Sequence, residues 1–457
     1  MMDTAMAARA VGGSIIGTSV SFSRVTTDTR ALAPGDLFVA LRGERFDGHD
    51  FVAQALASGA TAALVERERA KVLPGNLIAV DDPRCSLGAL AAFWRRRFDI
   101  PVAVVAGSNG KTTTKEMIAA VFRAAVGSDA VAATPGNFNN AIGMPLAILA
   151  LRAPHRLAVF EIGMNHRGET RELAAIAQPT IAVITNAQRE HQEFMRSVDE
   201  VAEEHADAVR ALRHPGTAIL NAGDARLATW RDAASAGGDA IVTFGIDAPA
   251  DISGRHAPHP DGAMLELATP AGNATVRLRV PGRHMAQNAL AAAAAAHAAG
   301  VPFSAIVQGL EAFRPVRGRL AVTTTPAGVL VIDDSYNANP DSVRAAIDVL
   351  ATRAAPRWLV LGDMGEVGDA GPAFHREIGL YARDAGIERL FAAGTLARDA
   401  TDAFGSAASH FASVDALAAS VAASAHAGVS VLVKGSRFMR MERVVAALTG
   451  EHTGDRH

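Results

Sequence analysis

One short segment combines glycine, lysine and threonine in the order that phosphate binding requires. It follows the apolar run 102–106 and reads Gly107-Ser108-Asn109-Gly110-Lys111-Thr112-Thr113. A glycine-rich turn between a strand and a helix presents unpaired backbone N–H groups to an anion. Lys111 adds a compact positive charge for terminal phosphates, and the Thr112 hydroxyl is placed to bind the Mg²⁺ that accompanies a nucleotide. The segment therefore predicts a nucleotide phosphate site.

The composition around this segment supports that interpretation. The chain has 44 basic residues, but only four are lysines, and two of these are Lys111 and Lys115. The spacing is shorter than the common G-x-x-x-x-G-K-[ST] form, because Val105 stands where that form has its first glycine. The alternative is a turn that merely joins a strand to a helix.

Two further apolar runs are followed by residues of types that can bind metals. Glu161 follows the run 157–160, and Asn186 and His191 lie in the polar segment after the run 180–185. Parallel strands end at one edge of a sheet, so these residues are expected beside the phosphate segment, where Mg²⁺ requires oxygen ligands. An acidic helix cap and a structural histidine are the alternatives.

Asparagine is concentrated in one loop near the phosphate segment. Asn137, Asn139 and Asn140 lie between Gly136 and Gly143. Asparagines often satisfy the backbone of turns, but three within four residues favour contacts with a polar substrate.

The last third of the chain repeats the pattern of strands followed by polar loops, at 333–340, 361–366 and 434–437. Tyr336 is one of only two tyrosines in the chain. Its place in such a loop favours stacking or a ribose contact over core packing.

Alternating strands and helices predict the elements that position these residues. The pattern is α/β throughout, with a parallel sheet after residue 102, a short antiparallel stretch at about 240–281 and a smaller Rossmann-like unit at the end. At 457 residues the chain exceeds a single core. The expected domains are an N-terminal substrate domain at 1–98, a central P-loop ATPase-like domain at 99–315 and a C-terminal Rossmann-like domain at 316–457.

Charge and cysteine content exclude several classes of protein. The formal net charge is -3 and no polybasic run occurs, so no nucleic-acid partner is expected. No apolar run suggests membrane insertion. A single cysteine, Cys85, excludes an internal disulfide and is expected to be buried filler. A reducing compartment, the cytoplasm, is therefore expected. A monomer is also expected, although no residue pattern decides it.

Taken together, these segments resemble the Mur ligase family. The similarity extends through all three blocks, and its most specific motifs lie outside the phosphate segment and Glu161. They are the segments 27–30, 35–41, 46–49, 136–140, 334–340, 361–364 and 434–437. These motifs are most similar to the branch that joins D-alanyl-D-alanine to UDP-MurNAc-tripeptide. The resemblance implies a ligase that uses ATP and Mg²⁺ and forms an acyl phosphate.

The resemblance also implies roles for individual residues. Lys111 would bind phosphates, and Thr112, Glu161 and His191 would hold the metal. Asn288 matches the adenine contact of the family and Arg319 its nucleotide-binding arginine, while Tyr336 and Asn337 match contacts from the C-terminal domain. Asp28, Arg30 and Asp47 would bind the uridine nucleotide.

One departure from the family pattern lies on the helix expected after His191. Mur ligases commonly carry there a lysine that CO₂ converts to a carbamate, which helps to hold a second Mg²⁺. No lysine occurs between Lys115 and Lys434, and His205 stands near the expected position. Glu204, His205 or Asp207 would then substitute, or the second metal site would be weaker.

Three other functions compete with this one. They are the neighbouring ligase that adds the third residue of the peptide, a folate-type glutamate ligase, and a nucleotide-binding regulatory protein without catalysis. The segments 136–140 and 334–340 argue against the first two. The joint presence of Lys111, Glu161 and His191 argues against the third. The sequence does not identify the third residue of the tripeptide.

Overall fold

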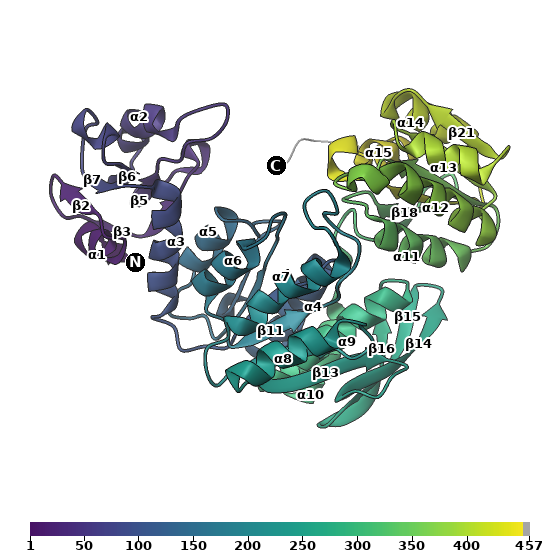
Figure 1. The fold of residues 1–457 in the computed structure, drawn as a ribbon, viewed down its shortest axis with the longest axis horizontal. Coiled ribbons are helices and arrows are strands. Elements are labelled where there is room, and N and C mark those ends of the chain that lie inside the picture. Colours follow the sequence, from purple (N-terminus) through teal and green to yellow (C-terminus); the bar gives the residue numbers. More distant parts are fainter. Residues whose placement is uncertain (451–457) are drawn as a thin grey trace.

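The chain folds into three α/β units, each built on its own sheet (Figure 1). The structure is a computed structural model and describes residues 1–450. The main sheets of the three units lie within 14–80, 102–278 and 321–434, inside the three predicted domain ranges. The domain boundaries themselves stay predictions. Within residues 1–450, no helix combines the length and apolarity needed to cross a membrane.

The N-terminal unit has a five-stranded sheet of order β2-β7-β6-β5-β4. Strands β4 to β7 are parallel, and β2 runs antiparallel to β7. A short antiparallel pair, β1 with β3, lies beside this sheet. The strands are β1 Met2–Asp3, β2 Ser14–Ile16, β3 Ser21–Phe22, β4 Arg24–Thr26, β5 Asp36–Val39, β6 Ala62–Glu66 and β7 Leu77–Val80. The helices are α1 Thr4–Ala10, α2 Val52–Ala57 and α3 Pro83–Arg95.

Helix α3 joins the first unit to the second. Its last residue, Arg95, is fully buried and donates hydrogen bonds to the carbonyl oxygens of Ala177, Phe98 and Gln178. Burial lowers the pKa of its guanidinium to about 10. Cys85, near the start of α3, is exposed, so the prediction that it fills a core was wrong. Its backbone N–H donates to the side chain of Asp82, which caps the helix, and Cys85 is not among the residues of α3 that pack into the core.

The central sheet has nine strands in the order β16-β15-β14-β13-β12-β11-β8-β10-β9. The strands from β9 to β14 in this order are parallel, whereas β15 and β16 are antiparallel additions. The antiparallel stretch predicted at about 240–281 is thus confirmed for the pairing of β14 to β16 and wrong for β13, which pairs in parallel with β12 and β14. Strand bounds are β8 Val102–Ala106, β9 Val131–Ala133, β10 Leu157–Glu161, β11 Ile181–Ile184, β12 Thr217–Asn221, β13 Ala240–Ile246, β14 Ile252–His259, β15 Gly262–Thr269 and β16 Gly272–Leu278. Helix bounds are α4 Lys111–Val126, α5 Gly143–Leu149, α6 Glu169–Ala177, α7 Val198–Arg210, α8 Leu227–Gly237, α9 Arg283–Ala298 and α10 Phe303–Ala312.

Helices cover both faces of this sheet, which explains why β8 is apolar along its whole length. Ala103 and Val105 pack into the core that contains α4, α9 and α10. Val102, Val104 and Ala106 pack into the opposite core, which contains residues of α3 and α5 to α8. Strand β8 lies between β11 and β10, so the chain crosses to both sides of it. In open α/β sheets, ligands bind at the carboxyl ends of strands at such a switch point.

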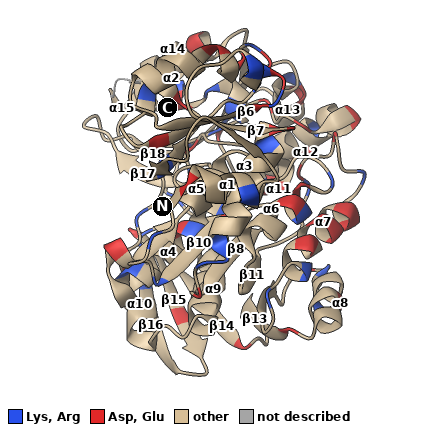
Figure 2. Cartoon of the chain, turned by 90° about the vertical axis from the view of Figure 1, so that its left-hand side faces the viewer, with Lys and Arg blue, Asp and Glu red and all other residues tan. Residues whose placement is uncertain are grey.

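The C-terminal unit has six strands in the order β17-β18-β22-β19-β20-β21, of which only β17 is antiparallel. They are β17 Ala321–Thr324, β18 Leu330–Asp334, β19 Arg357–Gly362, β20 Arg389–Ala393, β21 Ala408–Phe411 and β22 Ser430–Lys434. Its helices are α11 Pro340–Ala351, α12 Gly371–Asp384, α13 Ala397–Phe404, α14 Val414–Ser424 and α15 Glu442–Thr449. Acidic and basic segments are interspersed over the face shown in Figure 2, and helix α7 is mainly acidic.

Candidate active site

The predicted phosphate segment forms the turn from β8 into α4. Gly107 and Gly110 have φ angles of 125° and 84°, which favour glycine. A Cβ on Gly107 would lie 2.1 Å from Oγ1 of Thr185, and one on Gly110 would lie 2.3 Å from Oδ1 of Asn288. No side chain caps the N-terminus of α4 at Gly110. The turn therefore presents a helix N-terminus that fits a phosphate.

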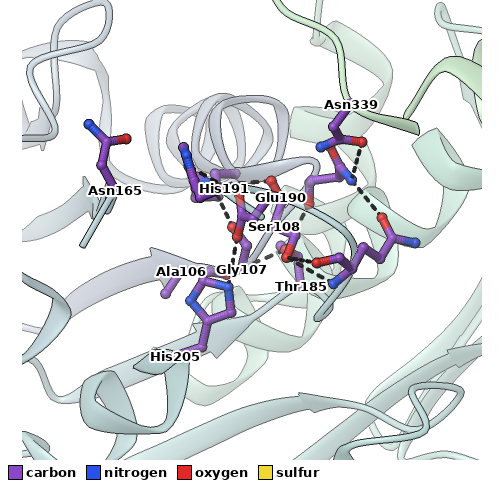
Figure 3. Close-up of polar contacts among 12 residues, drawn as sticks. Ala106, Gly107, Ser108, Asn165, Thr185, Glu190, His191, His205 and Asn339 are labelled. Carbon is purple, nitrogen blue, oxygen red and sulfur yellow. Dashed lines mark hydrogen bonds and ion pairs between the residues drawn. The ribbon is translucent and has the colours of Figure 1, made fainter. Parts of the chain in front are cut away.

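The loop after β11 holds this turn in place. Asn186 accepts hydrogen bonds from the backbone N–H of Ser108, through its carbonyl, and of Asn109, through Oδ1. In return, the side chains of Thr185 and Asn186 donate to the carbonyl oxygen of Asn109. Thr185 and Asn339 lie around the turn in Figure 3. The loop after β11 thus holds the phosphate turn from both its backbone and its side chains.

Lys111, the first residue of α4, folds back over the turn. Its ammonium donates to the carbonyl oxygens of Gly107 (2.6 Å) and Ser108 (3.1 Å) and to Oε2 of Glu190 (3.3 Å). Burial opposes ionisation of Glu190, but Lys111, His205 and His191 outweigh it and lower the pKa of this carboxyl to about 2. Lys111 thus lies at the phosphate turn, as predicted, beside a carboxylate that the prediction did not include.

Glu161 ends β10, next to β8, and lies against α4. Its Oε2 accepts a hydrogen bond from Oγ1 of Thr112 (2.7 Å), and its Oε1 accepts one from Nδ2 of Asn139 (2.7 Å). Strand pairing sets Glu161 opposite Val105, two residues before the turn. The structure thus brings together Thr112, Glu161 and Asn139 at the turn.

This donor set fits Mg²⁺ bound together with a nucleotide. A hydroxyl and a carboxylate are the oxygen ligands that Mg²⁺ prefers. Among residues 1–450, no three acidic, histidine or cysteine side chains form a metal-binding group. A Mg²⁺ ion held by Thr112 and Glu161 would therefore take most of its ligands from phosphates and water, which is its usual mode with nucleotides.

His191 lies in the loop after β11 and points to the C-terminal unit as well as to Glu190. Its Nε2 is 3.7 Å from Oε2 of Glu190, and its Nδ1 is 2.6 Å from Oε2 of Glu366. His191 lowers the pKa of Glu366. The backbone of His191 has a φ of 49°, the left-handed region that non-glycine residues seldom adopt. Its role as a metal ligand stays a prediction.

The three predicted loop asparagines have different surroundings. Asn139 binds Glu161, whereas Oδ1 of Asn140 accepts from the backbone N–H of Ile142 and of Gly143, where α5 begins. Asn137 is exposed. Asn139 and Asn140 line the large cavity described below.

The predicted nucleotide contacts come from both sides of a cleft between the central and C-terminal units. Asn288 is buried against Gly110, and the guanidinium of Arg319 lies 4.2 Å from the centre of the Tyr336 ring. Asn337 is exposed, and its carbonyl oxygen accepts from Nζ of Lys434. Thr113 lies in the first turn of α4. All of these residues line a cavity of about 2000 Å³ with the phosphate turn, Glu161 and His191.

The predicted uridine-binding residues lie in the N-terminal unit, outside that cavity lining. Asp28 and Arg30 pair with each other at 2.8 Å; Asp28 is partly exposed and Arg30 is exposed, and neither lines the cavity. Asp47 caps a short 3₁₀ turn through the backbone N–H of His49. The unit does reach the cavity through Arg42, Glu44 and Arg84. Uridine binding by Asp28, Arg30 and Asp47 stays a prediction.

Family models match most of this chain. The model described as "Mur ligase family, catalytic domain" matches residues 21–95, "Mur ligase middle domain" matches 105–296, and "Mur ligase, glutamate ligase domain" matches 318–437. A UDP-N-acetylmuramoyl-tripeptide--D-alanyl-D-alanine ligase of Escherichia coli is 38% identical over 442 residues, 96% of each chain. The chain belongs to the Mur ligase family.

Solved structures of Mur ligases share the whole architecture. A crystal structure of MurF from Acinetobacter baumannii superposes with a TM-score of 0.90 at 34% identity, covering 98% of this chain and 99% of that one. MurF from Thermotoga maritima, solved in complex with ADP, superposes with a TM-score of 0.83 at 27% identity, covering 94% and 97%. The predicted α/β fold with three units is thus confirmed.

The helix that lacks the Mur ligase lysine is α7, and its three candidate substitutes differ in their contacts. Glu204 accepts from the backbone N–H of Gly168 and Thr170, at the start of α6. Asp207 pairs with Arg171 and Arg210. Of the three, only His205 contacts the loop between β11 and α7, which holds the phosphate turn. Its Nε2 lies 3.1 Å from Oε1 of Glu190 in that loop.

Glu190 is the residue at this site that sequence reasoning missed. It is 5% exposed and contacts both Lys111 and His205. Figure 3 shows Glu190 together with His191 and His205. Its position directly before His191 was a signal, but a carboxylate in a polar loop is usually solvated. Only the folded structure shows that this one is buried.

Proposed function

We propose that this chain joins D-alanyl-D-alanine to the C-terminal carboxylate of UDP-MurNAc-tripeptide, with ATP converted to ADP and phosphate. Curated relatives that are 36% to 38% identical over nearly their whole length carry the name of this activity. One observation carries the chemical part of the proposal. The ammonium of Lys111, the N-terminus of α4 and the pair Thr112 and Glu161 converge on one cavity shared by the central and C-terminal units.

In the first step, an oxygen of the tripeptide carboxylate attacks the γ-phosphorus of ATP and the bond to the β-phosphate oxygen breaks. ADP leaves, and an acyl phosphate forms. Lys111 and the backbone N–H groups at the start of α4 would offset the negative charge on the phosphate oxygens. Thr112 and Glu161 would hold Mg²⁺, which neutralises charge on the phosphates when it is bound.

In the second step, the amine of D-alanyl-D-alanine attacks the acyl carbon, the amide bond forms and phosphate leaves with the carboxylate oxygen. The protein contributes positions and charge rather than a covalent intermediate. Arg319, Tyr336 and Asn337 line the far side of the cavity, where they would close on the nucleotide. Asn139 and Asn140 would contact the peptide, while Asp28, Arg30 and Asp47 would hold the uridine end.

We also assign the chain to the cytoplasm, where ATP and nucleotide-linked precursors occur, and we expect a monomer with boundaries near residues 98 and 315. Acidic and basic residues are interspersed along the chain in Figure 2, which is consistent with small-molecule partners.

The function is tested by ADP release with ATP, Mg²⁺ and UDP-MurNAc-tripeptide, with and without D-alanyl-D-alanine. We expect turnover that requires the dipeptide and falls by about 10³-fold or more in Lys111→Ala, because the charge on the transferred phosphoryl group is then uncompensated. Turnover with a single amino acid, including glutamate, in place of the dipeptide would assign the chain to a different ligase reaction.

A further inference from the structure

Glu190 has contacts that relate it to the lysine of the phosphate turn. Its two carboxylate oxygens face two different elements, with Oε2 at 3.3 Å from Nζ of Lys111 on α4 and Oε1 at 3.1 Å from Nε2 of His205 on α7. We infer that Glu190 is a positioning residue that fixes the ammonium of Lys111 over the phosphate turn, and that His205 holds Glu190 in place. The inference rests on the proposed ATP-dependent function.

The contacts of Lys111 show what Glu190 adds. A lysine ammonium has three N–H donors, and here they face the carbonyl oxygens of Gly107 and Ser108 and the carboxylate of Glu190. The two carbonyls belong to the turn itself and would hold a lysine at any such helix start. Among residues 1–450, Glu190 is the one partner of this ammonium from another part of the chain. It therefore determines the direction in which the long, flexible lysine side chain lies.

The burial of Glu190 makes this contact specific. The residue is 5% exposed, and a buried carboxylate is stable only with charged or hydrogen-bonding partners. His205 is 1% exposed and contacts one carboxylate oxygen of Glu190, Oε1, while Lys111 contacts the other, Oε2. Its neighbours on α7, Glu204 and Asp207, bind other groups. His205 thus acts on the phosphate site through Glu190.

Both residues that flank Glu190 are tied to the C-terminal unit. Arg189 pairs with Asp341 of α11 (2.6 Å) and with Glu377 of α12 (2.7 Å). His191 contacts Glu366, whose carbonyl oxygen also accepts from the backbone N–H of Glu193. The backbone on either side of Glu190 is therefore fixed. A small displacement of this loop would move Lys111, and misplacement of a charge by about 1 Å can reduce a rate by ~10²-fold.

Lysine NMR tests this positioning without any ligand. The chain has only four lysines, of which Lys71 is exposed and Lys115 and Lys434 are buried. The ε-CH₂ signal of Lys111 can be assigned as the one that disappears in Lys111→Ala. We expect Glu190→Gln to shift and sharpen that signal alone, and His205→Gln to shift it less in the same direction. The control Glu193→Gln makes the same chemical change on an exposed residue of the same loop and should shift none of the four. An unchanged Lys111 signal in a folded Glu190→Gln protein would overturn the inference.

A double-mutant cycle on ATP affinity tests the functional consequence. We expect Glu190→Gln to raise the Kd of ATP by about tenfold when Lys111 is present. In the Lys111→Ala background, we expect Glu190→Gln to raise it by less than about twofold. Equal changes in both backgrounds would show that Glu190 acts on the nucleotide directly and would overturn the positioning role. The cycle is run in EDTA, because an effect that appears only with Mg²⁺ would identify Glu190 as a metal ligand instead. Glu190→Asp, which keeps the charge, should restore part of the affinity.

The NMR result separates this inference from the proposed function. A chain that fails the acceptor assay while Glu190→Gln shifts Lys111 would lose its assigned reaction and keep the positioning role. If Glu190→Gln does not fold, His205→Gln decides the matter, because it loosens Glu190 and leaves its charge in place.

Discussion

Glu161 and Glu190 are two buried carboxylates beside the same phosphate turn, but their partners differ in charge. Glu161 accepts hydrogen bonds from neutral groups, the hydroxyl of Thr112 and the amide of Asn139. Glu190 faces the ammonium of Lys111 and the imidazole of His205. A carboxylate with neutral donors keeps its charge for an incoming cation, whereas one beside a lysine is already compensated. On this comparison we propose metal binding for Glu161 and positioning for Glu190.

Among changes to the two carboxylates and to the loop that carries Glu190, loss of the Glu161 carboxylate should have the largest effect. We expect Glu161→Gln to lower kcat by about 10²-fold to 10³-fold, because a metal that neutralises phosphate charge would lose a ligand. A Mg²⁺ titration of the rate should show half-saturation at higher concentration than in the wild type.

The same titration of Glu190→Gln separates the two carboxylates. We expect a lower maximal rate with the wild-type half-saturation by Mg²⁺, and Glu193→Gln should match the wild type in both. If Glu161→Gln and Glu190→Gln shift the Mg²⁺ dependence equally, the distinction between the two carboxylates is wrong.

The second expected effect concerns the loop between β11 and α7, here called the Glu190 loop, and its attachment to the C-terminal unit. Asp341 and Glu377 raise the pKa of the Arg189 guanidinium, and Phe374 lies 5.2 Å from it. We expect Arg189→Ala to lower kcat by about tenfold, because it releases both the loop and the docking of α11 and α12.

Small-angle scattering should give a larger radius of gyration for the Arg189→Ala protein than for the wild type. Arg196→Ala is the matched control, because it removes an exposed arginine of the same loop. A full rate in Arg189→Ala would mean that the Glu190 loop keeps its position without the C-terminal unit.

The last expected effect is on stability in acid rather than on the rate. The folded pKa of Glu190 is about 2, against an ordinary value of 4.5. Because the folded value is the lower one, this carboxylate stabilises the fold above pH 4.5, and the contribution, ~3 kcal/mol, is lost as the pH falls towards 2. The unfolding midpoint of the wild type should therefore fall more steeply below pH 4.5 than that of Glu190→Gln. Parallel curves for the two proteins would argue against an ionised, buried Glu190.

Local patterns in the sequence predicted the parts of the site that depend on neighbouring residues. The turn 107–113 follows from an apolar strand, two glycines and a helix start, and Glu161 follows from the end of a second parallel strand. Both are properties of one strand and the residues after it. The three-unit fold was predictable for the same reason.

The environment of Glu190 was not predictable in this way. It depends on His205, which is 15 residues away, and on the ion pair between Arg189 and Asp341, which are 152 residues apart. It also depends on the left-handed backbone of His191, which no residue preference indicates. The prediction for Cys85 failed for a related reason. The packing of α3 determines which of its residues face solvent, and Cys85 is one of them.

The most direct test of the proposed reaction is the fate of an oxygen atom. UDP-MurNAc-tripeptide labelled with ¹⁸O in its C-terminal carboxylate is incubated with the wild-type chain, ATP, Mg²⁺ and D-alanyl-D-alanine, and the released phosphate is analysed by mass spectrometry. Ligation through an acyl phosphate predicts one labelled oxygen in each phosphate, because the carboxylate oxygen that attacks phosphorus leaves with it. Amide product accompanied by unlabelled phosphate would contradict the acyl phosphate and the roles assigned to Lys111 and Glu161.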